Sequence, residues 1–312
     1  MSKTEILQAD DNGLTRAAEL LRAGSLVAFP TETVYGLGAD ATDDRAVARI
    51  FAAKNRPQFN PLIVHLPDLE TARAIAEFND TALRLAEAFW PGALTLVLPL
   101  KSNSGIAPLV GAGLPSIALR IPDHALAQDL LHRIGRPIAA PSANPSGRIS
   151  PTNAAHVRQG LDGQIEAILD GGSCTVGVES TILGLTETPT LLRPGGLPAE
   201  AIEACLGTSL SHHIPETPNA PGQLASHYAP NAKIRLNVIE PDPGEVLLGY
   251  GKVNAKLNLS PSGDLTEAAA NLFHHLHALD SFATNIAVSP IPDHGLGRAI
   301  NDRLKRAAAP RP

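Results

Sequence analysis

Short apolar runs alternate with amphipathic, helix-like segments along the first two-thirds of this 312-residue chain. Leu14–Arg22 has apolar residues at helical spacing and ends before Gly24, and Ser25–Phe29 is an apolar run that Pro30 ends. Asp43–Lys54 begins with acidic residues and ends with a base, which suits the helix dipole. Alternation of this kind is typical of an α/β fold, in which helices cover a central sheet.

Several neighbouring strand-like runs follow one another without a helix between them. Leu94–Leu98 and Ile117–Ile121 are one such pair, and Thr181–Leu185 and Thr190–Leu192 are another. A parallel pair needs a long crossover connection, usually a helix, whereas antiparallel strands can be joined directly. The sequence therefore predicts a mixed sheet and not a purely parallel one.

A proline-rich stretch with little periodic apolarity interrupts the alternation. Loops of this length are usually functional or disordered. Beyond it, strand-like runs and a helical pattern over Leu265–Leu279 form a small α/β unit. We therefore predict an α/β domain over 1–207, a linker over 208–233 and a small α/β domain over 234–312, in keeping with roughly 150 residues per domain.

The charge balance of the chain is acidic. It carries 25 Lys and Arg against 31 Asp and Glu, for a net charge of −6, and the acidic excess lies in residues 1–207. A protein that grips nucleic acid through its phosphates normally has a basic domain or stripe. We therefore expect no tight nucleic-acid binding. An anionic ligand would be held by a few local cations, which points to a small molecule.

Targeting and redox features favour a cytoplasmic protein. No apolar run approaches the roughly 18 residues of a membrane span, and the N-terminal MSKTEILQADDNG lacks the basic and apolar regions of a secretory signal. Cys174 and Cys205 are too few for a disulfide framework or a four-ligand zinc site. We expect no membrane span and a reducing cytoplasm.

The familiar nucleotide and hydrolase motifs are absent. The chain has neither GxxxxGK[ST] nor GxSxG, and Gly36–Gly38 is a poor dinucleotide loop because polar residues 31–33 separate it from the preceding strand. His274, His275 and His277 share one amphipathic helix without matching carboxylates. We interpret them as surface or partly packed residues and not as metal ligands.

Two polar segments in the first third of the chain are better candidates for a site. PTETVYGLG, over 30–38, places hydroxyls, a carboxylate and a phenol after a buried strand, where ligands commonly lie. Lys54 and Arg56 in KNRP, with Asn60 close behind, offer cations and an amide to phosphate or carboxylate oxygens. Each segment also has a plain structural interpretation, since threonines cap turns and bases satisfy the carbonyls at a helix end.

Two later segments add small and hydroxyl-bearing residues. APSANPSG, over 140–147, permits close backbone approach and offers neutral hydrogen bonds, and Ser150 follows it. VEST, over 178–181, precedes Arg193 by a dozen residues. A plain turn and a strand cap are the structural alternatives. Arg193 is the more suggestive residue, because it precedes Pro-Gly-Gly in a chain poor in cations.

Together these segments resemble the YrdC/Sua5 family. PTETVYGLG, KNRP, PLIVHL, ALRIPDH, APSAN, ESTIL and LLRPG occur in the order seen in that family, over about residues 12–207. APGQLASHYAP followed by a small α/β unit resembles the longer Sua5 type. The resemblance implies an α/β fold with two parts. The first is a YrdC-like domain with a twisted mixed sheet and a large, positively charged concave cavity, and the second is a small Rossmann-like C-terminal domain.

The resemblance also implies an activity, that of a nucleotidyltransferase termed L-threonylcarbamoyladenylate synthase. Such enzymes condense L-threonine, bicarbonate and ATP to threonylcarbamoyl-AMP and release pyrophosphate. The adenylate serves tRNA processing, as the source of N6-threonylcarbamoyladenosine at position 37 of tRNAs that read ANN codons. The implied partners are therefore these substrates and downstream tRNA threonylcarbamoyl transferase proteins. Mg²⁺ is implied through the ATP phosphates, with no metal ligands from the protein.

Family site residues carry over onto matching positions of this sequence. The KxR and SxN motifs imply catalytic roles for Lys54, Arg56, Ser142 and Asn144. L-Threonine binding is implied for Thr33, Tyr35, His65, Arg120, the Ala140 backbone and Ser180. ATP binding is implied for Arg56, Asn60, Ser116, Ser142, Ser150, Arg193, His227 and Tyr228. We expect the linker over 208–233 to cover the active site and exclude water, which would hydrolyse a labile adenylate.

Two other function classes stay open at this point. The first is an RNA-binding module of the YrdC fold, against which the net charge of −6 argues. The second is an enzyme that uses carbamoyl phosphate, whose appended zinc-finger and acylphosphatase segments have no counterpart in this sequence. A salt titration of tRNA binding beside an ATP–pyrophosphate exchange assay separates the first class from a synthase.

Overall fold

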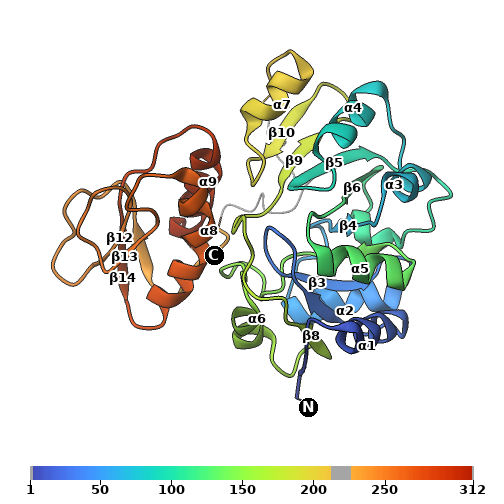
Figure 1. Ribbon diagram of the computed structural model, residues 1–312, viewed down its shortest axis with the longest axis horizontal. Helices are drawn as coiled ribbons and strands as arrows, with labels where there is room; N and C mark the ends of the chain where they lie inside the picture. The colour runs from blue at the N-terminus through green and yellow to red at the C-terminus, as the bar shows by residue number, and fades with distance from the viewer. Residues whose placement is uncertain (1–2, 212–225, 311–312) are drawn as a thin grey trace.

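The computed structural model describes residues 3–211 and 226–310, which form two lobes (Figure 1). The larger lobe extends from the N-terminal residues to residue 211, and the smaller lobe holds the C-terminal residues. The helices are α1 (Asp11–Arg22), α2 (Asp44–Lys54), α3 (Leu69–Ile75), α4 (Asp80–Phe89), η1 (Pro108–Gly111), α5 (Ala125–Ile134), α6 (Ala154–Leu161), α7 (Ala199–Leu206), α8 (Leu265–Asp280) and α9 (Leu296–Ala308).

The larger lobe is built on one sheet with the strand order β1-β8-β2-β3-β7-β4-β6-β5-β9-β10. β4 and β6 are parallel whereas β5 and β6 are antiparallel, so the predicted mixed sheet is confirmed. Strands far apart in the sequence are neighbours here, which brings the separate polar segments together. The strands are β1 (Glu5–Leu7), β2 (Val27–Phe29), β3 (Gly36–Asp40), β4 (Ile63–His65), β5 (Leu94–Pro99), β6 (Ser116–Arg120), β7 (Ile138–Ala139), β8 (Ala167–Leu169), β9 (Thr181–Gly184) and β10 (Thr190–Arg193).

β3 lies where the sequence indicated only a polar turn. Its glycines give the strand no side-chain alternation, and the structure shows why they are there. A Cβ on Gly38 would lie 2.9 Å from the ring of Phe29 and 3.1 Å from Cγ2 of Ile138, so side chains of the neighbouring strands occupy that space. A strand of this kind has no periodic signal, because the packing depends on a missing side chain.

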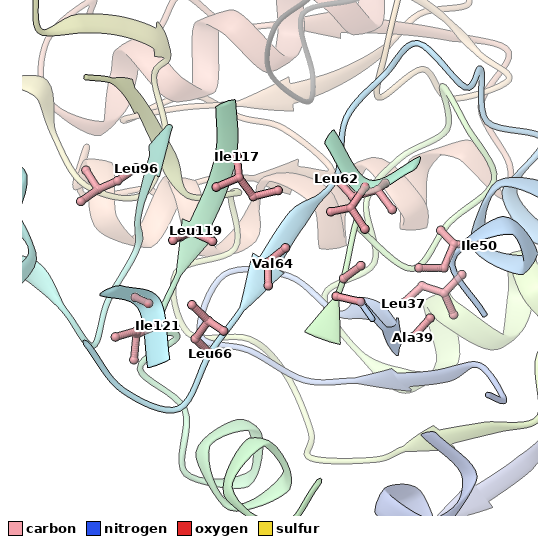
Figure 2. Packing of buried hydrophobic residues seen from close by; sticks show 14 of the residues in the cluster. Leu37, Ala39, Ile50, Leu62, Val64, Leu66, Leu96, Ile117, Leu119 and Ile121 are labelled. Carbon is pink, nitrogen blue, oxygen red and sulfur yellow. The ribbon is translucent and has the colours of Figure 1, made fainter. Parts of the chain in front are cut away.

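The helices begin after capping residues, and they cover a buried sheet. Asp43 caps α2 by accepting hydrogen bonds from the amides of Arg45 and Ala46. Figure 2 shows Ile50 of that helix packed near Leu37 of β3 in the buried cluster. Close packing of this core holds the strands rigidly, so side chains at strand ends are placed with little freedom.

The smaller lobe is a parallel sheet in the order β11-β14-β12-β13, with α8 and α9 between it and the larger lobe (Figure 1). The parallel strands, with α8 between β13 and β14, are in keeping with the Rossmann-like unit that the resemblance implied. β13 is only two residues long. The strands are β11 (Lys233–Arg235), β12 (Val246–Gly249), β13 (Leu257–Asn258) and β14 (Asn285–Val288).

An apolar interface joins the two lobes. Val34 and Val178 of the larger lobe belong to the same buried cluster as Phe273 of α8. His156 of α6 stacks on His277 of α8, with 3.9 Å between the ring centroids. The helix that carries His274, His275 and His277 is therefore partly packed, which is one of the two alternatives, surface or partly packed, that the sequence indicated. Within residues 3–211 and 226–310, no helix is both long enough and apolar enough to cross a membrane.

Candidate active site

A small cavity lies where the polar segments of the larger lobe meet the described end of the linker. Its volume is about 40 Å³, enough for about three water molecules. The walls come from the loop after β2, the turn after α2, the last residues of β4, β6 and β10, the loop after β7, and residues 227–228. Segments separated by up to two hundred residues thus share one hollow.

Arg120, the last residue of β6, is held in the wall by a buried ion pair. Its Nη2 donates to Oε1 of Glu32 at 2.5 Å, its Nη1 to Oγ1 of Thr33 at 2.8 Å, and its Nε to the carbonyl of Gly92 at 3.3 Å. Arg120 and Glu32 are 3% and 6% exposed, so the pair is desolvated. Of the five N–H groups of a guanidinium, one on each terminal nitrogen is left for a ligand carboxylate.

His65 lies beside Arg120 because β4 and β6 pair these two residues in register. Its ring is buried and meets the ring of Phe29 edge-on, with 6.1 Å between centroids. Burial, followed by the charge of Arg120, lowers the pKa of His65 to about 3, so the ring is neutral at pH 7. Its Nδ1 is buried without a hydrogen-bond partner among the described residues, which fits a ligand contact.

The end of α2 turns a second arginine into the site. Asn55 follows the helix in the left-handed conformation (φ 50°), which asparagine tolerates better than most residues. This reversal directs Arg56 back toward the sheet. Its Nε donates to the carbonyl of Asn60 at 3.1 Å and its Nη2 to the carbonyl of Pro61 at 2.8 Å.

Lys54 ties the end of α2 to the loop after β7. Its Nζ donates to the carbonyl of Ser142 at 2.5 Å and to that of Asn144. Nδ2 of Asn144 donates to the carbonyls of Pro145 and Arg148 at 2.8 and 2.9 Å, which closes the loop on itself. The KxR and SxN motifs therefore meet, and Lys54 fixes the backbone of the second motif.

Lys54 and Arg56 are buried cations whose hydrogen bonds go to carbonyls. Burial, followed by the charge of Arg56, lowers the pKa of Lys54 well below its usual value. Burial, followed by the charge of Arg193, lowers the pKa of Arg56 to about 9. In the part of the chain that the structure describes, no carboxylate forms an ion pair with either side chain. A bound anion would raise both pKa values and offset the cost of burying these charges.

β9 and β10 bring Ser180 and Arg193 together. Oγ of Ser180 lies 2.7 Å from Oγ1 of Thr95, and Nη2 of Arg193 donates to the Ser180 carbonyl at 2.8 Å. Position 195, two residues after Arg193, requires a glycine. A Cβ there would lie 2.3 Å from the carbonyl carbon of Ser180, so the two backbones touch. The approach holds Arg193 against the start of β9.

His227 and Tyr228 close the cavity from the linker. Their rings meet edge-on at 4.3 Å between centroids, and the ring of Tyr228 lies 5.6 Å from that of Phe273 in α8. Burial, followed by the charge of Arg56, lowers the pKa of His227 to about 3. Both residues line the cavity, whose volume of about 40 Å³ is small, whereas the family resemblance implied a large one. Residues 212–225 of the predicted cover lie outside the described residues.

Asn60 carries two buried polar atoms without a partner. The residue is 1% exposed, and among the described residues neither its Oδ1 nor its Nδ2 has a hydrogen bond. Nδ1 of His227 and the hydroxyl of Tyr228 are also buried without a hydrogen-bond partner among the described residues. Buried polar groups are nearly always paired, and leaving one unpaired costs about 1–3 kcal/mol. Such groups next to the buried Arg56 mark a site built for a polar ligand.

Comparison with known families agrees with this geometry. The Sua5/YciO/YrdC family profile, described as "Telomere recombination", matches residues 19–195. The chain belongs to the Sua5/YciO/YrdC family. A second profile, described as the C-terminal domain of threonylcarbamoyl-AMP synthase, matches residues 197–309. The family that the sequence motifs predicted is therefore confirmed, and so is its longer type.

Relatives within the Sua5/YciO/YrdC family cover nearly the whole chain. Threonylcarbamoyl-AMP synthase of Pyrococcus abyssi is 42% identical over 94% of this chain and 93% of its own length. The Bacillus subtilis protein of the same name is 41% identical, over 99% and 96%. The crystal structure of P. abyssi Sua5 complexed with L-threonine has a TM-score of 0.90 at 39% identity and covers 98% of both chains. The predicted activity agrees with the names of these relatives.

Most residues that family resemblance assigned to the site line the cavity. They are Thr33, Arg56, His65, Arg120, Ala140, Ser142, Ser180, Arg193, His227 and Tyr228. Lys54, Asn60 and Asn144 are not among the lining residues, but their hydrogen bonds hold the loops that carry the lining. Ser150 is also behind the wall, with its Oγ donating to Oε1 of Glu179 at 2.5 Å.

Tyr35 and Ser116 lie away from this cavity. Val34 and Gly36 line it, and successive side chains of an extended segment point in opposite directions, so Tyr35 faces the core. Its hydroxyl donates to the carbonyl of Gly172 at 2.7 Å, so Tyr35 anchors a loop and does not line this cavity. Ser116 begins β6, four residues or about 13 Å before the arginine that ends the strand.

Two carboxylates of the site were given no role by the sequence motifs. Glu32 holds Arg120, and Glu179 lines the cavity. Both belong to candidate segments, and the only available signal was a carboxylate next to a candidate residue. A buried carboxylate needs a cation partner, and the sequence does not show which cation that is.

Three of the four carboxylate oxygens of Glu32 and Glu179 accept hydrogen bonds from the protein, and Oε2 of Glu32 has no partner among the described residues. Oε1 of Glu32 accepts from Arg120, and the two oxygens of Glu179 accept from Ser150 and Arg303. Across residues 3–211 and 226–310, no three His, Cys, Asp or Glu side chains are grouped to hold a metal ion. The cavity therefore offers mainly guanidinium and neutral hydrogen-bond donors.

Proposed function

We propose that the chain is an L-threonylcarbamoyladenylate synthase, which condenses L-threonine, bicarbonate and ATP. One observation carries the proposal: Arg120, with N–H groups left for a carboxylate, shares a cavity with the buried guanidinium groups of Arg56 and Arg193. Guanidinium groups are suited to the oxygens of amino-acid carboxylates and phosphates. Relatives that carry this name resemble the chain over nearly its whole length.

The reaction begins with the amino acid. The amine of L-threonine adds to the carbon of bicarbonate, and loss of water gives a carbamate. Arg120 binds the L-threonine carboxylate, with Thr33, Ser180 and the Ala140 backbone placing the rest of the molecule. Because His65 is neutral, its Nδ1 is available to the hydroxyl or the amine without adding charge.

Transfer to the nucleotide follows. A carbamate oxygen attacks the α-phosphorus of ATP, the bond to the bridging oxygen breaks, and pyrophosphate leaves. Both reactants are anions, so their repulsion must be offset before in-line attack is possible. Arg56 and Arg193 supply charge at the cavity wall. Lys54 uses two N–H groups on carbonyls and has a third for a carbamate or phosphate oxygen.

Mg²⁺ enters this scheme with the nucleotide. The carboxylates at the cavity already accept hydrogen bonds from the protein, whereas arginine and neutral donors are plentiful. This set suits a triphosphate that carries its own counter-ion, and Mg²⁺ often keeps few protein ligands. We therefore propose that Mg²⁺ is held through the ATP phosphates, where it offsets the charge of the leaving pyrophosphate.

The segment of His227 and Tyr228 has to move for substrates to enter. A cavity of about 40 Å³ holds neither L-threonine nor ATP. We propose that the linker over 208–233 opens for binding and closes again to exclude water from the adenylate. A variant lacking residues 219–232 should hydrolyse its product faster or make none. An unchanged yield of intact product from that variant would rule the cover out.

Mass spectrometry of the product tests the activity. Full-length protein with L-threonine, ¹³C-labelled bicarbonate, ATP and Mg²⁺ should give threonylcarbamoyl-AMP that carries the label, and one pyrophosphate for each adenylate. Reactions without bicarbonate are the control. No labelled adenylate from folded protein would contradict the proposal. Tight, salt-sensitive tRNA binding without any product would instead favour an RNA-binding module.

The product is a reactive anhydride, so it must be consumed close to where it forms. We propose that it passes to tRNA threonylcarbamoyl transferase proteins, which modify position 37 of tRNAs that read ANN codons. The free thiols of Cys174 and Cys205 suit a reducing cytoplasm. Transfer of the labelled carbonyl to tRNA on adding those proteins would support this assignment, and failure of transfer would refute it.

A further inference from the structure

A buried arginine of the smaller lobe reaches the wall of the cavity. Arg303 lies on α9 and is 0% exposed. Its Nε donates to Oε2 of Glu179 at 2.8 Å, and its Nη1 donates to the carbonyl of Pro194 at 2.7 Å and to Oδ2 of Asp302 at 2.8 Å. Asp302 is also paired with Arg306, whose Nε lies 2.9 Å from Oδ1. Glu179 precedes Ser180, and Pro194 follows Arg193. One guanidinium of the smaller lobe therefore holds the neighbours of two residues that line the cavity.

Glu179 is the end of this contact that faces the cavity. Its Oε1 accepts from Oγ of Ser150 at 2.5 Å while Oε2 accepts from Arg303, so both oxygens are fixed. Burial raises the pKa of Glu179, but the charges of Arg303 and Arg193 and the bond from Ser150 outweigh it and leave the pKa below its usual value. The carboxylate is therefore ionised at neutral pH.

An ionised carboxylate beside a phosphate site needs a counter-charge. Without one, Glu179 would repel the phosphates of a bound nucleotide across a cavity where water screens little. Burying an ion pair is itself costly. The two lobes are also joined by an exposed pair that avoids this cost, Arg298 and Glu200, which are 3.5 Å apart and 38% and 44% exposed. The burial of Arg303 is therefore better explained by a role at the site than by the joining of lobes.

On the basis of the function proposed above, we propose that Arg303 is a positioning residue for the nucleotide. It fixes Glu179 against Ser150 and offsets the charge of Glu179. It also holds the Pro194 carbonyl, so that Arg193 faces the cavity. The nucleotide side of the site is therefore made by both lobes, and the smaller lobe contributes a charge to it.

The test compares nucleotide and amino-acid affinity in full-length variants. Arg303→Met removes the charge, Arg303→Lys keeps a charge without the planar fork, and the double variant Arg303→Met/Glu179→Gln removes both charges. Arg298→Met is the matched control, because it removes an exposed arginine from the same helix and the same lobe contact. Isothermal titration gives the Kd of ATP with Mg²⁺ and, separately, the Kd of L-threonine. Thermal unfolding identifies the variants that are folded.

Arg303→Met should raise the Kd of ATP about ten-fold or more, since a charge-assisted contact of the wall is lost. The Kd of L-threonine should stay within about three-fold. Arg303→Lys should raise the Kd of ATP less. The double variant should recover at least half of the loss on a logarithmic scale, because the unpaired charge of Glu179 is gone and Asp302 keeps its ion pair with Arg306. Arg298→Met should leave both affinities unchanged.

Equal ATP affinity in Arg303→Met and wild type would overturn the inference. An equal loss of ATP and L-threonine affinity would also overturn it, because that result indicates a general collapse of the lobe contact. If Arg303→Met does not fold, Arg303→Lys and the double variant decide by the same comparison. Wild-type protein that binds ATP but forms no threonylcarbamoyl-AMP would refute the proposed function and leave this inference standing.

Discussion

Replacing Arg120 by methionine separates the binding role of this residue from its structural role. The side chain gives three hydrogen bonds to the protein and has one N–H on each terminal nitrogen left for a carboxylate. A charge-assisted hydrogen bond contributes about 1.5–3 kcal/mol. Even if only one such bond is lost, the Kd of L-threonine should rise about ten- to 150-fold.

The same substitution removes the partner of a buried carboxylate. Glu32 is 6% exposed, and among the described residues its Oε2 has no hydrogen bond even with Arg120 in place. Breaking a buried ion pair from one side costs about 3–5 kcal/mol of stability. The double variant Arg120→Met/Glu32→Gln has no unpaired charge. It should therefore recover most of that stability but none of the lost affinity.

Titration calorimetry with L-threonine and urea unfolding of the same samples measure the two effects independently. L-Threoninol, which has no carboxylate, is the matched ligand control and should bind wild type and variants equally weakly. A folded double variant that binds L-threonine within two-fold of wild type would show that Arg120 does not hold the carboxylate, and the assignment of the amino-acid half of the site would fail with it.

Three further substitutions test other parts of the argument. Gly195→Ala should lower the free energy of unfolding in urea by about 1–3 kcal/mol and weaken ATP binding, because the added Cβ meets the backbone at Ser180. Normal ATP affinity in this variant would contradict the proposed position of Arg193. Tyr35→Phe should lose about 1–3 kcal/mol through an unpaired loop carbonyl yet bind L-threonine normally, and a large rise in Kd would return Tyr35 to the threonine pocket. The free energy of unfolding of the wild type should fall as the pH drops below about 6.5. Below that pH His65 is protonated in the unfolded chain, whereas in the folded protein burial lowers its pKa to about 3. His65→Asn should make that fall shallower by about 1.4 kcal/mol per pH unit, and equal slopes would show that His65 is not buried in its neutral form.

Elements with a strong periodic pattern were predictable from the sequence. Asp43–Lys54 and Leu265–Leu279 agree with α2 and α8 to within a residue at each end. Capping residues and amphipathic faces are local properties, so local sequence predicts them. β3 was not predictable, because its glycines are selected by close contact with other strands and leave no pattern. β1 was missed because three residues are too few to show an alternation.

The candidate site was predictable as a set of residue types but not as an arrangement. Family motifs identified Arg56, His65 and Arg120 as candidate site residues, and all three line the cavity. Their motifs do not reveal that β4 and β6 set His65 and Arg120 side by side, or that Glu32 is the partner of Arg120. Such pairings arise from strand order, which depends on contacts between residues far apart in the chain.

The sequence by itself determined the fold class, the family, the helices of strong period and most of the polar residues around the cavity. Those properties are carried by local composition and ordered motifs. Tertiary structure alone decided that Tyr35 faces the core, that Tyr228 lines the cavity, and that Arg303 of the smaller lobe pairs with Glu179. Side-chain direction and the pairing of buried charges are fixed only when distant segments pack together. The free energy that selects them comes from desolvation in the assembled core, and no short stretch of sequence contains it.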